Sequence, residues 1–208
     1  MKNQRLPKTH LLKALLFTLA LFFTLSFPIG AQARTYKNLR ALYPMVNAKV
    51  IKQVKRHHCK LVTTDNLPYY LGGLTKGRFW FTGRKKHVKF TMYVRPQYLG
   101  TTVAYHELGH CIDFLCSKMY IRYNTGYVRL RSSYPDFKRI YEIEKNNYHS
   151  LDRITSRVYT VSTSMEYFAQ CFADYTLHPR ELYNMCPNTF HYIRKCVKLV
   201  KKGKVLPR

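Results

Sequence analysis

The stretch His106-Glu107-Leu108-Gly109-His110 decides which fold this chain is expected to have. Residues four positions apart lie on one face of an α-helix, so His106 and His110 would point together and bind one metal ion. Two imidazoles with an adjacent carboxylate are typical of zinc sites that hydrolyse their substrates. The alternative is a surface helix whose histidines have ordinary hydrogen-bond partners.

The residues around this motif predict a helix that is mostly buried. Thr101 and Thr102 follow Gly100 and are candidates for the N-cap. Apolar residues then recur at positions 103, 104, 108, 112, 114, 115 and 119. Gly109 lowers helix stability relative to alanine, so its place between the two histidines indicates that another backbone packs closely there.

Residues 1–33 predict a signal peptide. Lys2, Arg5, Lys8 and Lys13 make the first thirteen positions basic, an apolar run extends from Ala14 to Phe27, and Ala31-Gln32-Ala33 forms a cleavage site. An uncleaved anchor is the alternative, although the apolar run is shorter than the roughly 20 residues that span a bilayer. We therefore expect cleavage after Ala33, export to the medium or a periplasm, and no stable membrane span afterwards.

The remaining residues, 34–208, fit one domain with a sizeable core. The leader contains four of the 36 basic residues and none of the ten acidic residues, so residues 34–208 keep a net charge of +22. A positive field of this size favours anionic partners such as nucleic acid, wall polymers, lipid headgroups or acidic proteins.

All six cysteines lie in the part that we expect to be exported. They are Cys59, Cys111, Cys116, Cys171, Cys186 and Cys196. An even number of cysteines in an oxidising compartment permits up to three disulfides, of unknown connectivity. A Cys111–Cys171 bridge would clamp the two helices that carry the site, and simple buried thiols are the alternative.

The rest of the chain predicts an α+β fold that is mainly helical. Helical spacing is expected in residues 36–57, 136–146, 165–176 and from Pro187 past Val200. Between Lys60 and Tyr98, short aromatic and β-branched runs separated by glycines indicate a small antiparallel sheet beside the metal-binding helix. No internal repeat is present.

A catalytic zinc with two histidine ligands takes a third protein ligand and keeps one position for water. Apart from Glu107, the chain contains four glutamates that could be this third ligand. Glu142 and Glu144 lie in a lysine-rich helix that we expect to face solvent, and Glu181 lies at a helix start, where an acid complements the helix dipole. Glu166 lies in an apolar helix and is the best candidate, unless its carboxylate serves a capping box with Thr163.

Two segments after the motif resemble a known family. Tyr159 lies seven positions before Glu166, and the run Glu166-Tyr167-Phe168-Ala169-Gln170-Cys171-Phe172 resembles the catalytic domain of anthrax lethal factor and the secreted Pro-Pro endopeptidases, which are gluzincin metallopeptidases. The resemblance extends to Asp113 and to Cys186-Pro187-Asn188-Thr189-Phe190. It covers roughly residues 86 to 200 and implies a zincin-like fold.

This resemblance implies a role for each matching residue. His106, His110 and Glu166 would bind one Zn²⁺ per chain, Glu107 would be the general base, and Tyr159 would donate a hydrogen bond to the developing oxyanion. The position four residues after Glu166 is often a second acid in the family, and here it is Gln170, which hydrogen-bonds without charge. Asp113 either orients a ligand histidine or has a surface or capping role.

The resemblance also implies how substrate binds. Gluzincins commonly bind a peptide as an added antiparallel strand at a sheet edge, and the resemblance puts that edge at Lys89 to Val94. Three basic runs, Lys52 to Lys60, Arg84 to Lys89 and Arg194 to Arg208, are either solvated faces or contacts to an anionic surface polymer. No recognisable nucleic-acid-binding motif accompanies the charge, so nucleic acid is disfavoured.

The sequence therefore predicts a secreted, monomeric zinc endopeptidase that cleaves protein or peptide substrates with a metal-activated water. The alternative is a secreted cationic protein, toxin-like or surface-binding, whose zincin site is degenerate or only structural.

Overall fold

A computed structural model describes residues 33–67, 69–70, 73–82, 89–117 and 130–204. The predicted signal peptide lies outside these residues, apart from Ala33, as does most of the basic run at Arg84 to Lys89. Within the described residues, every helix is too short or too polar to cross a membrane.

Four strands form a mixed sheet. They are β1 (Arg34–Tyr36), β2 (Cys59–Thr63), β5 (Gly77–Thr82) and β6 (Lys89–Val94), in the order β1-β2-β6-β5. The β5–β6 pair is antiparallel as predicted. The β1–β2 pair, whose strand β1 was not predicted, is also antiparallel, whereas β2 pairs with β6 in parallel. β2 and β6 run in the same direction because β5, which lies between them in the sequence, runs in the opposite direction. Two short strands, β3 (Tyr69–Tyr70) and β4 (Gly73–Leu74), form a separate pair.

This strand order corrects the predicted substrate edge. The segment Lys89 to Val94 is β6, which lies between β2 and β5 and has both sides hydrogen-bonded. The edge strand beside it is β5, which the sequence alone did not single out.

Helices make up most of the described fold, as predicted. They are α2 (Leu39–Leu42), α3 (Ala48–Arg56), α4 (Thr102–Cys116), α5 (Pro135–Glu144), α6 (Arg157–Thr160), α7 (Ser164–Leu177), α8 (Pro179–Met185) and α9 (Pro187–Lys201), with 3-10 turns η1 (Pro96–Tyr98) and η2 (Arg131–Ser133). The mainly helical α+β class is therefore confirmed.

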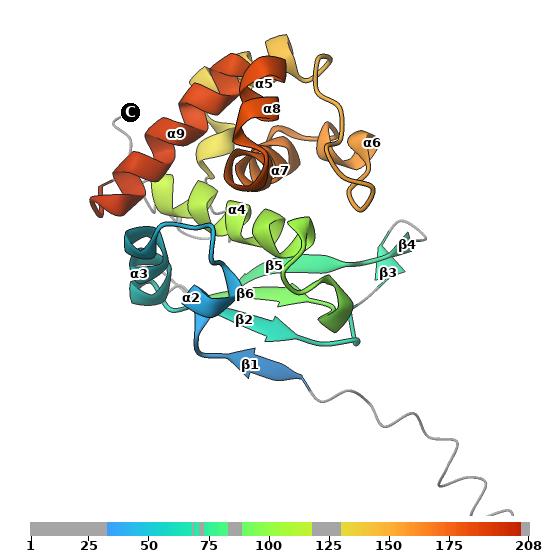
Figure 1. Ribbon diagram of the computed structural model, residues 1–208, viewed down its shortest axis with the longest axis vertical. Coiled ribbons are helices and arrows are strands. Elements are labelled where there is room, and N and C mark those ends of the chain that lie inside the picture. Colours follow the sequence, from blue (N-terminus) through green and yellow to red (C-terminus); the bar gives the residue numbers. More distant parts are fainter. Residues whose placement is uncertain (1–32, 68, 71–72, 83–88, 118–129, 205–208) are drawn as a thin grey trace, which may run out of the picture. The chain divides into compact units, whose positions relative to one another are not determined.

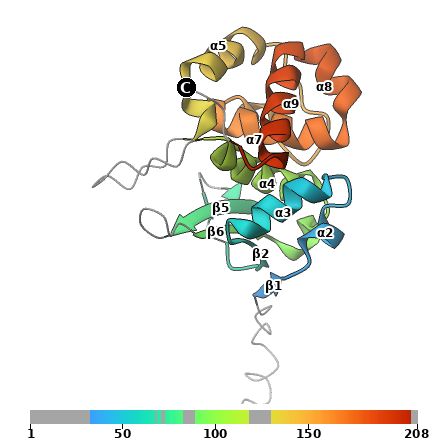
Figure 2. The same cartoon turned by 90° about the vertical axis from the view of Figure 1, so that its left-hand side faces the viewer.

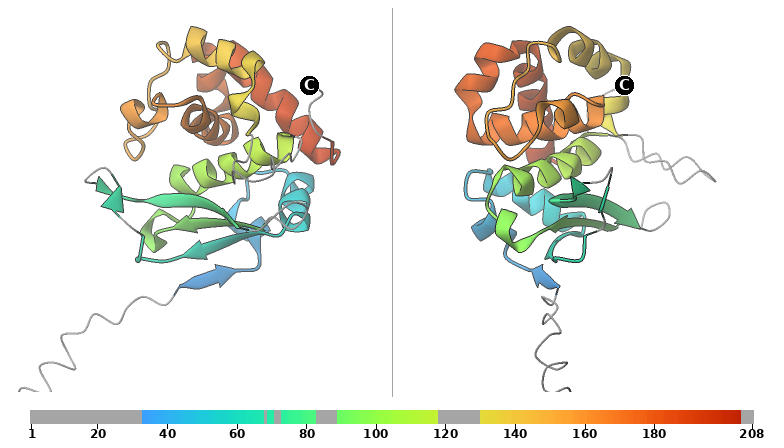
Figure 3. Two further views of the ribbon diagram at one scale, coloured as in Figure 1. Left: turned by 180° about the vertical axis from the view of Figure 1, so that it is seen from behind. Right: turned by 90° about the vertical axis from the view of Figure 1, so that its right-hand side faces the viewer.

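The helix α4 is the centre of the fold. In Figure 1 the sheet lies below α4, and α5, α7, α8 and α9 lie above it. Figure 3 shows the same order of layers from two other sides. Every residue of α4 is buried, because the sheet covers one side and α7 and α9 cover the other. Thr101 is its N-cap and accepts a hydrogen bond from the Val103 amide at 3.3 Å, as the sequence predicted.

Alternation along β6 explains how the sheet attaches to α4. Phe90, Met92 and Val94 are buried, while the residues between them are more exposed. The rings of Phe90 and Phe114 of α4 have centroids 4.1 Å apart. Side chains on this face of the sheet therefore bury the underside of α4, and its other side is left for α7.

Candidate metal centre

His106 and His110 lie on the same side of α4, one turn apart. Their ring centroids are 4.8 Å apart and their planes are nearly perpendicular, at 87°. Both side chains are buried, with 5% of each residue exposed. Phe79 of β5 packs against the His110 ring at a centroid distance of 5.8 Å. The helical period and the neighbouring strand together hold the two imidazoles toward one point.

Glu166 of α7 completes a three-residue cluster with these histidines. Its Oε2 atom lies 3.0 Å from Nε2 of His106 and 3.5 Å from Nε2 of His110. Thr163 caps α7 by accepting a hydrogen bond from the Glu166 amide at 3.1 Å. Only this half of the capping box, the alternative role of Glu166, is formed, since the carboxylate turns to the imidazoles instead.

The spacing of the three side chains fits a tetrahedral metal ion. Their candidate ligand atoms all lie within 4.8 Å of one another. Ligands about 2.0–2.1 Å from zinc lie about 3.3 Å apart in a tetrahedron, close to the two distances from Glu166. Two neutral imidazoles and one carboxylate are also the donor set of catalytic zinc sites that keep a fourth position for water. The residues therefore fit Zn²⁺.

Electrostatics keep Glu166 ionised. Burial alone would raise the pKa of its carboxyl group, but hydrogen bonds from His106 and His110 outweigh burial and hold this pKa well below its ordinary value. A charged carboxylate in this buried position is the form that binds a divalent cation.

A chain of hydrogen bonds extends from His106 into the helical layer. Nδ1 of His106 lies 3.1 Å from Oε1 of Gln170, and Nε2 of Gln170 donates to Oδ1 of Asp174 at 3.3 Å. The Tyr148 hydroxyl donates to Oδ2 of Asp174 at 2.9 Å. Because the amide nitrogen of Gln170 is used by Asp174, its oxygen faces His106, so Nδ1 carries the proton and Nε2 keeps its lone pair for a metal.

Gln170 therefore performs the orienting task that the missing second acid would have performed. The sequence did not identify Asp174 or Tyr148 as part of this chain. Asp174 lies one helical turn after Gln170, which was the available signal. Tyr148 comes from the loop after α5 and gave no local signal.

Glu107 lies beside the cluster in a tight, buried setting. Only 4% of the residue is exposed, and its Oε2 atom has no hydrogen-bond partner among the described residues. Burial raises the pKa of Glu107 to about 8, and the nearby His106 partly offsets this rise. A Cβ atom at Gly77 of β5 would lie 2.5 Å from Oε1 of Glu107. Glycine at position 77 thus leaves the room that this carboxylate occupies.

Comparison with known families is consistent with this geometry. The family model described as anthrax toxin lethal factor, N- and C-terminal domain, matches residues 34–196. The chain belongs to this family. The match includes all three members of the metal cluster, and the predicted resemblance to lethal factor is confirmed. A comparison with curated proteins finds no significant match.

Tyr159 lies near the cluster, as expected for a lethal factor family site. It belongs to α6, and its ring centroid is 6.0 Å from that of His106. The residue is 45% exposed, unlike the buried side chains around it. Its location beside the imidazole and open to solvent is compatible with a hydroxyl that meets a substrate, and its catalytic role stays a prediction.

Of the roles that the sequence suggested for Asp113, the structure shows a capping one, and it shows neither a surface position nor a contact that orients a histidine. It is completely buried and accepts a hydrogen bond from the Ser132 amide of η2 at 2.7 Å. Burial raises the pKa of Asp113 to about 7, and the hydrogen bonds from Ser132 and the charge of Arg131 oppose this rise. The side chain holds the η2 turn against α4 and orients no histidine of the cluster.

Glu144 was wrongly expected to face solvent. Only 2% of the residue is exposed, and its carboxylate accepts hydrogen bonds from the Asn188 and Thr189 amides at 2.9 and 2.8 Å. These amides begin α9, where an anionic group satisfies unpaired backbone donors. Glu142 is exposed and pairs with Lys145, as its lysine-rich surroundings suggested.

The six cysteines are buried thiols in this structure. The Cys59 and Cys111 thiols hydrogen-bond to each other, as do those of Cys116 and Cys196. Cys111 is therefore the neighbour of Cys59 in β2, and the suggested Cys111–Cys171 clamp is not formed.

Proposed function

We propose that this member of the lethal factor family is a secreted zinc endopeptidase. The observation that carries the proposal is the convergence of His106, His110 and Glu166 on one point beside the buried carboxylate of Glu107. This arrangement combines three metal donors with a proton acceptor, which a site built only for structure does not need.

Each side chain has a task in peptide hydrolysis. A zinc ion held by the three ligands would supply Lewis-acid activation of water and of the scissile carbonyl. Glu107 accepts a proton from the attacking water and delivers it to the leaving amine. Glu107 can take and return this proton because its buried carboxylate lies directly beside the metal donors. Tyr159 donates a hydrogen bond to the oxygen of the tetrahedral intermediate.

The substrate strand is proposed to pair with β5. This strand is the sheet edge next to α4, and its Gly77 and Phe79 contact Glu107 and His110 respectively. A peptide added along β5 would gain main-chain hydrogen bonds and lie next to the metal ligands. The positive charge of the chain favours acidic peptides over basic ones.

Export is part of the proposal. It is supported by the basic and apolar pattern of residues 1–33, and the family match begins at the next residue, Arg34. Exported protein would begin at Arg34, which N-terminal sequencing of the secreted chain tests directly. Cleavage elsewhere in the chain, or retention of the leader, would count against this step.

The decisive experiment combines metal analysis with a peptide-library digest. We expect residues 34–208 to bind about one zinc per chain and to cleave peptides. Glu107→Gln should keep zinc and lose cleavage by a factor of about a thousand or more, since proton transfer is removed while the ligands remain. The control Glu181→Gln changes an exposed acid on α8 and should behave like the wild type.

The same measurements separate the rival function. A cationic binding protein with a structural zinc site would hold zinc and cleave nothing in the library, and Glu107→Gln would change neither property. Wild-type protein that binds no zinc while remaining folded would contradict the proposed metal site itself.

A further inference from the structure

The acidic residues of this chain are unevenly distributed. Five of the ten acidic residues are buried in the interior, namely Glu107, Asp113, Glu144, Glu166 and Asp174. The other five are Asp65, Asp136, Glu142, Asp152 and Glu181. Two of these pair with basic residues, Asp136 with Arg131 and Glu142 with Lys145. None of the ten lies on α3 or α9, so the positive charge of these two helices has no acidic residue within them to offset it.

The two helices are separated by more than a hundred residues in the sequence and lie side by side in the fold. The C-terminal part of α9 lies next to α3 in Figures 1 and 2, and the two helices pack against each other. At this junction a Cβ atom on Gly203 would lie 3.3 Å from Nε2 of Gln53. Two basic runs that appear independent in the sequence therefore become one surface.

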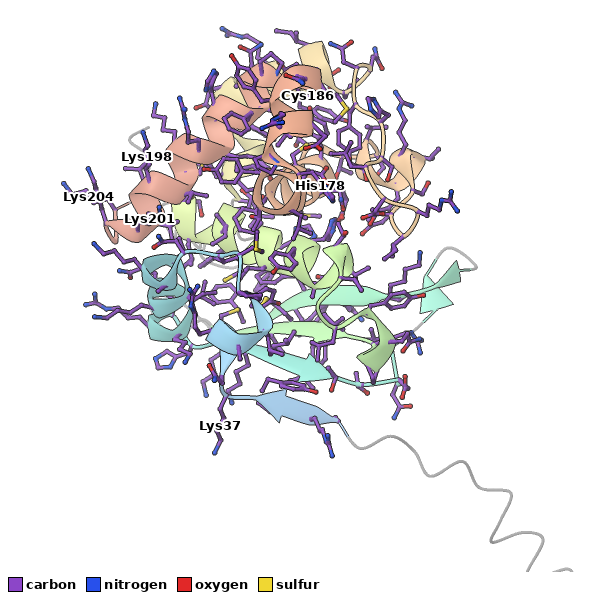
Figure 4. All side chains as sticks on the ribbon, viewed as in Figure 1. Lys37, His178, Cys186, Lys198, Lys201 and Lys204 are labelled. Atoms are coloured by element: carbon purple, nitrogen blue, oxygen red, sulfur yellow. The ribbon has the colours of Figure 1, made fainter. Side chains whose placement is uncertain are left out.

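The basic side chains of this surface face solvent. Val50, Ile51 and Val54 bury one side of α3, and Ile193, Cys196, Val197 and Val200 bury one side of α9. The opposite sides are left with exposed cations: Lys49, Lys52, Lys55 and Arg56 on α3, Arg194, Lys195 and Lys198 on α9, and Lys202 and Lys204 just after it. In Figure 4, Lys198, Lys201 and Lys204 lie along the C-terminal part of α9, the part of the helix that is next to α3.

The dimensions of the surface favour a polymer over a single ion. Each residue of a helix adds about 1.5 Å, so the cations from Lys49 to Arg56 and from Arg194 to Lys202 each extend over roughly 10–12 Å. A lone phosphate contacts only a few cations at once. A chain that carries many anionic groups can contact both helices and release bound counterions along its whole path.

The chemistry of the surroundings favours a soluble polymer over a membrane. Peripheral membrane helices combine basic residues with apolar side chains that enter the lipid. Among the described residues, the exposed large apolar side chains are Met45, Trp80, Ile143, Val158, Tyr159, Met165 and Tyr183, and none of these belongs to α3 or α9. The two helices themselves offer charge without an apolar anchor, and the exposed Met45 beside them lines a cavity with Val50, Val197 and Lys201.

We propose that the α3–α9 surface binds a linear polyanion that carries repeated phosphate or sulfate groups. This site shares no residue with the candidate metal centre, so the proposal does not depend on peptidase activity. Binding would hold the protein on an acidic matrix or coat while the metal centre acts elsewhere on the molecule.

The test compares two variants that lose the same number of charges. The surface variant carries Lys52→Gln, Arg56→Gln, Lys198→Gln and Lys202→Gln. The control carries Lys138→Gln, Arg139→Gln, Arg153→Gln and Arg180→Gln, which are exposed cations outside α3 and α9. Binding of residues 34–208 to fluorescent polyphosphate and to heparin is measured at 0.15 M salt, together with binding to phosphatidylglycerol vesicles.

We expect the wild type to bind at least one of the two polymers, and the responsive polymer identifies phosphate or sulfate as the group recognised. The surface variant should bind about a hundredfold more weakly and show a shallower salt dependence, while the control changes binding less than about threefold. A charge-conserving variant, Lys52→Arg with Lys198→Arg and Lys202→Arg, should bind like the wild type because it keeps the charge, and an unchanged urea unfolding curve of the surface variant excludes a folding defect. Equal losses in surface variant and control, or binding to vesicles without binding to either polymer, would overturn the proposal.

Discussion

Gly109 of α4 lies directly against the backbone of Ala169 of α7. A Cβ atom at position 109 would be 2.5 Å from the Ala169 carbonyl oxygen and 2.8 Å from its Cα atom. This is the close approach that a glycine between the two histidines predicted, and it brings Glu166 and Gln170 of α7 within reach of His106. The positions of the metal-binding side chains therefore depend on a contact between two backbones. A change in side-chain conformation on α7 cannot make room at this contact.

Gly109→Ala should therefore weaken both fold and site. An alanine in a helix normally adds about 1 kcal/mol of stability relative to glycine. Here the methyl group would push α4 and α7 apart, and overpacking of this kind costs about 1–3 kcal/mol. We expect a lower free energy of unfolding in urea and weaker zinc binding. A variant as stable as the wild type, with unchanged zinc affinity, would show that the helices tolerate separation.

Gln170→Ala should lower zinc affinity by about ten- to a hundredfold, because His106 loses the acceptor that fixes its ring and tautomer. The measurement is competition with a zinc chelator at fixed pH. Gln53→Ala, a change on α3, is the control and should leave zinc affinity unchanged. An unchanged affinity in Gln170→Ala would mean that burial alone orients His106.

Asp113→Asn should change how stability depends on pH. The pKa of this carboxyl group is about 7 in the folded chain and is ordinarily near 3.8. A raised pKa means that the folded state holds the proton more tightly, so the contribution of Asp113 is fully present below pH 3.8 and is lost as pH rises through about 7. Three pKa units correspond to about 4 kcal/mol as an upper bound.

The measurement for Asp113 is urea unfolding of metal-free protein between pH 5 and pH 8. The wild type should lose stability across this range relative to Asp113→Asn, which keeps an oxygen for the Ser132 amide. Glu181→Gln serves as the control and should follow the wild type. Parallel curves for wild type and Asp113→Asn would show that Asp113 does not titrate between pH 5 and pH 8 and would contradict a pKa near 7.

In a compartment that oxidises thiols, we expect bridges between Cys59 and Cys111 and between Cys116 and Cys196, because these thiols already lie in hydrogen-bonding contact. Each bridge removes two hydrogen atoms, so the unreduced exported chain should be about 4 Da lighter than the reduced chain. Peptide mapping without reductant identifies the partners. Alkylation of all six cysteines after unfolding without reductant would contradict this expectation.

Much of the site could be predicted from local patterns. The helical period alone requires His106 and His110 to share a face, and the apolar surroundings of Glu166 separated it correctly from Glu142 and Glu181. Glu144 was misjudged because its neighbours in sequence are polar, whereas the amides that it binds belong to α9. Its burial is caused by a helix more than forty residues away.

The order of the strands was also beyond the reach of local patterns. Alternating side chains in Lys89 to Val94 identify a strand but do not say which strands lie on either side of it. The pairings with β2 and β5 make β6 internal and leave β5 at the edge next to Glu107. For the same reason, Tyr148 could not be connected with Asp174 from the sequence.

The sequence by itself determined the helix with its two imidazoles, the glutamate beside them and the unusual excess of positive charge, because these properties depend on residue type and on spacing within one segment. The tertiary structure alone decided how near Glu166 comes to the histidines, which amide orients His106, which strand forms the edge and that two distant basic runs share one surface. Those relationships depend on packing between segments, and the close contact of Gly109 with Ala169 is the physical reason that the metal donors meet.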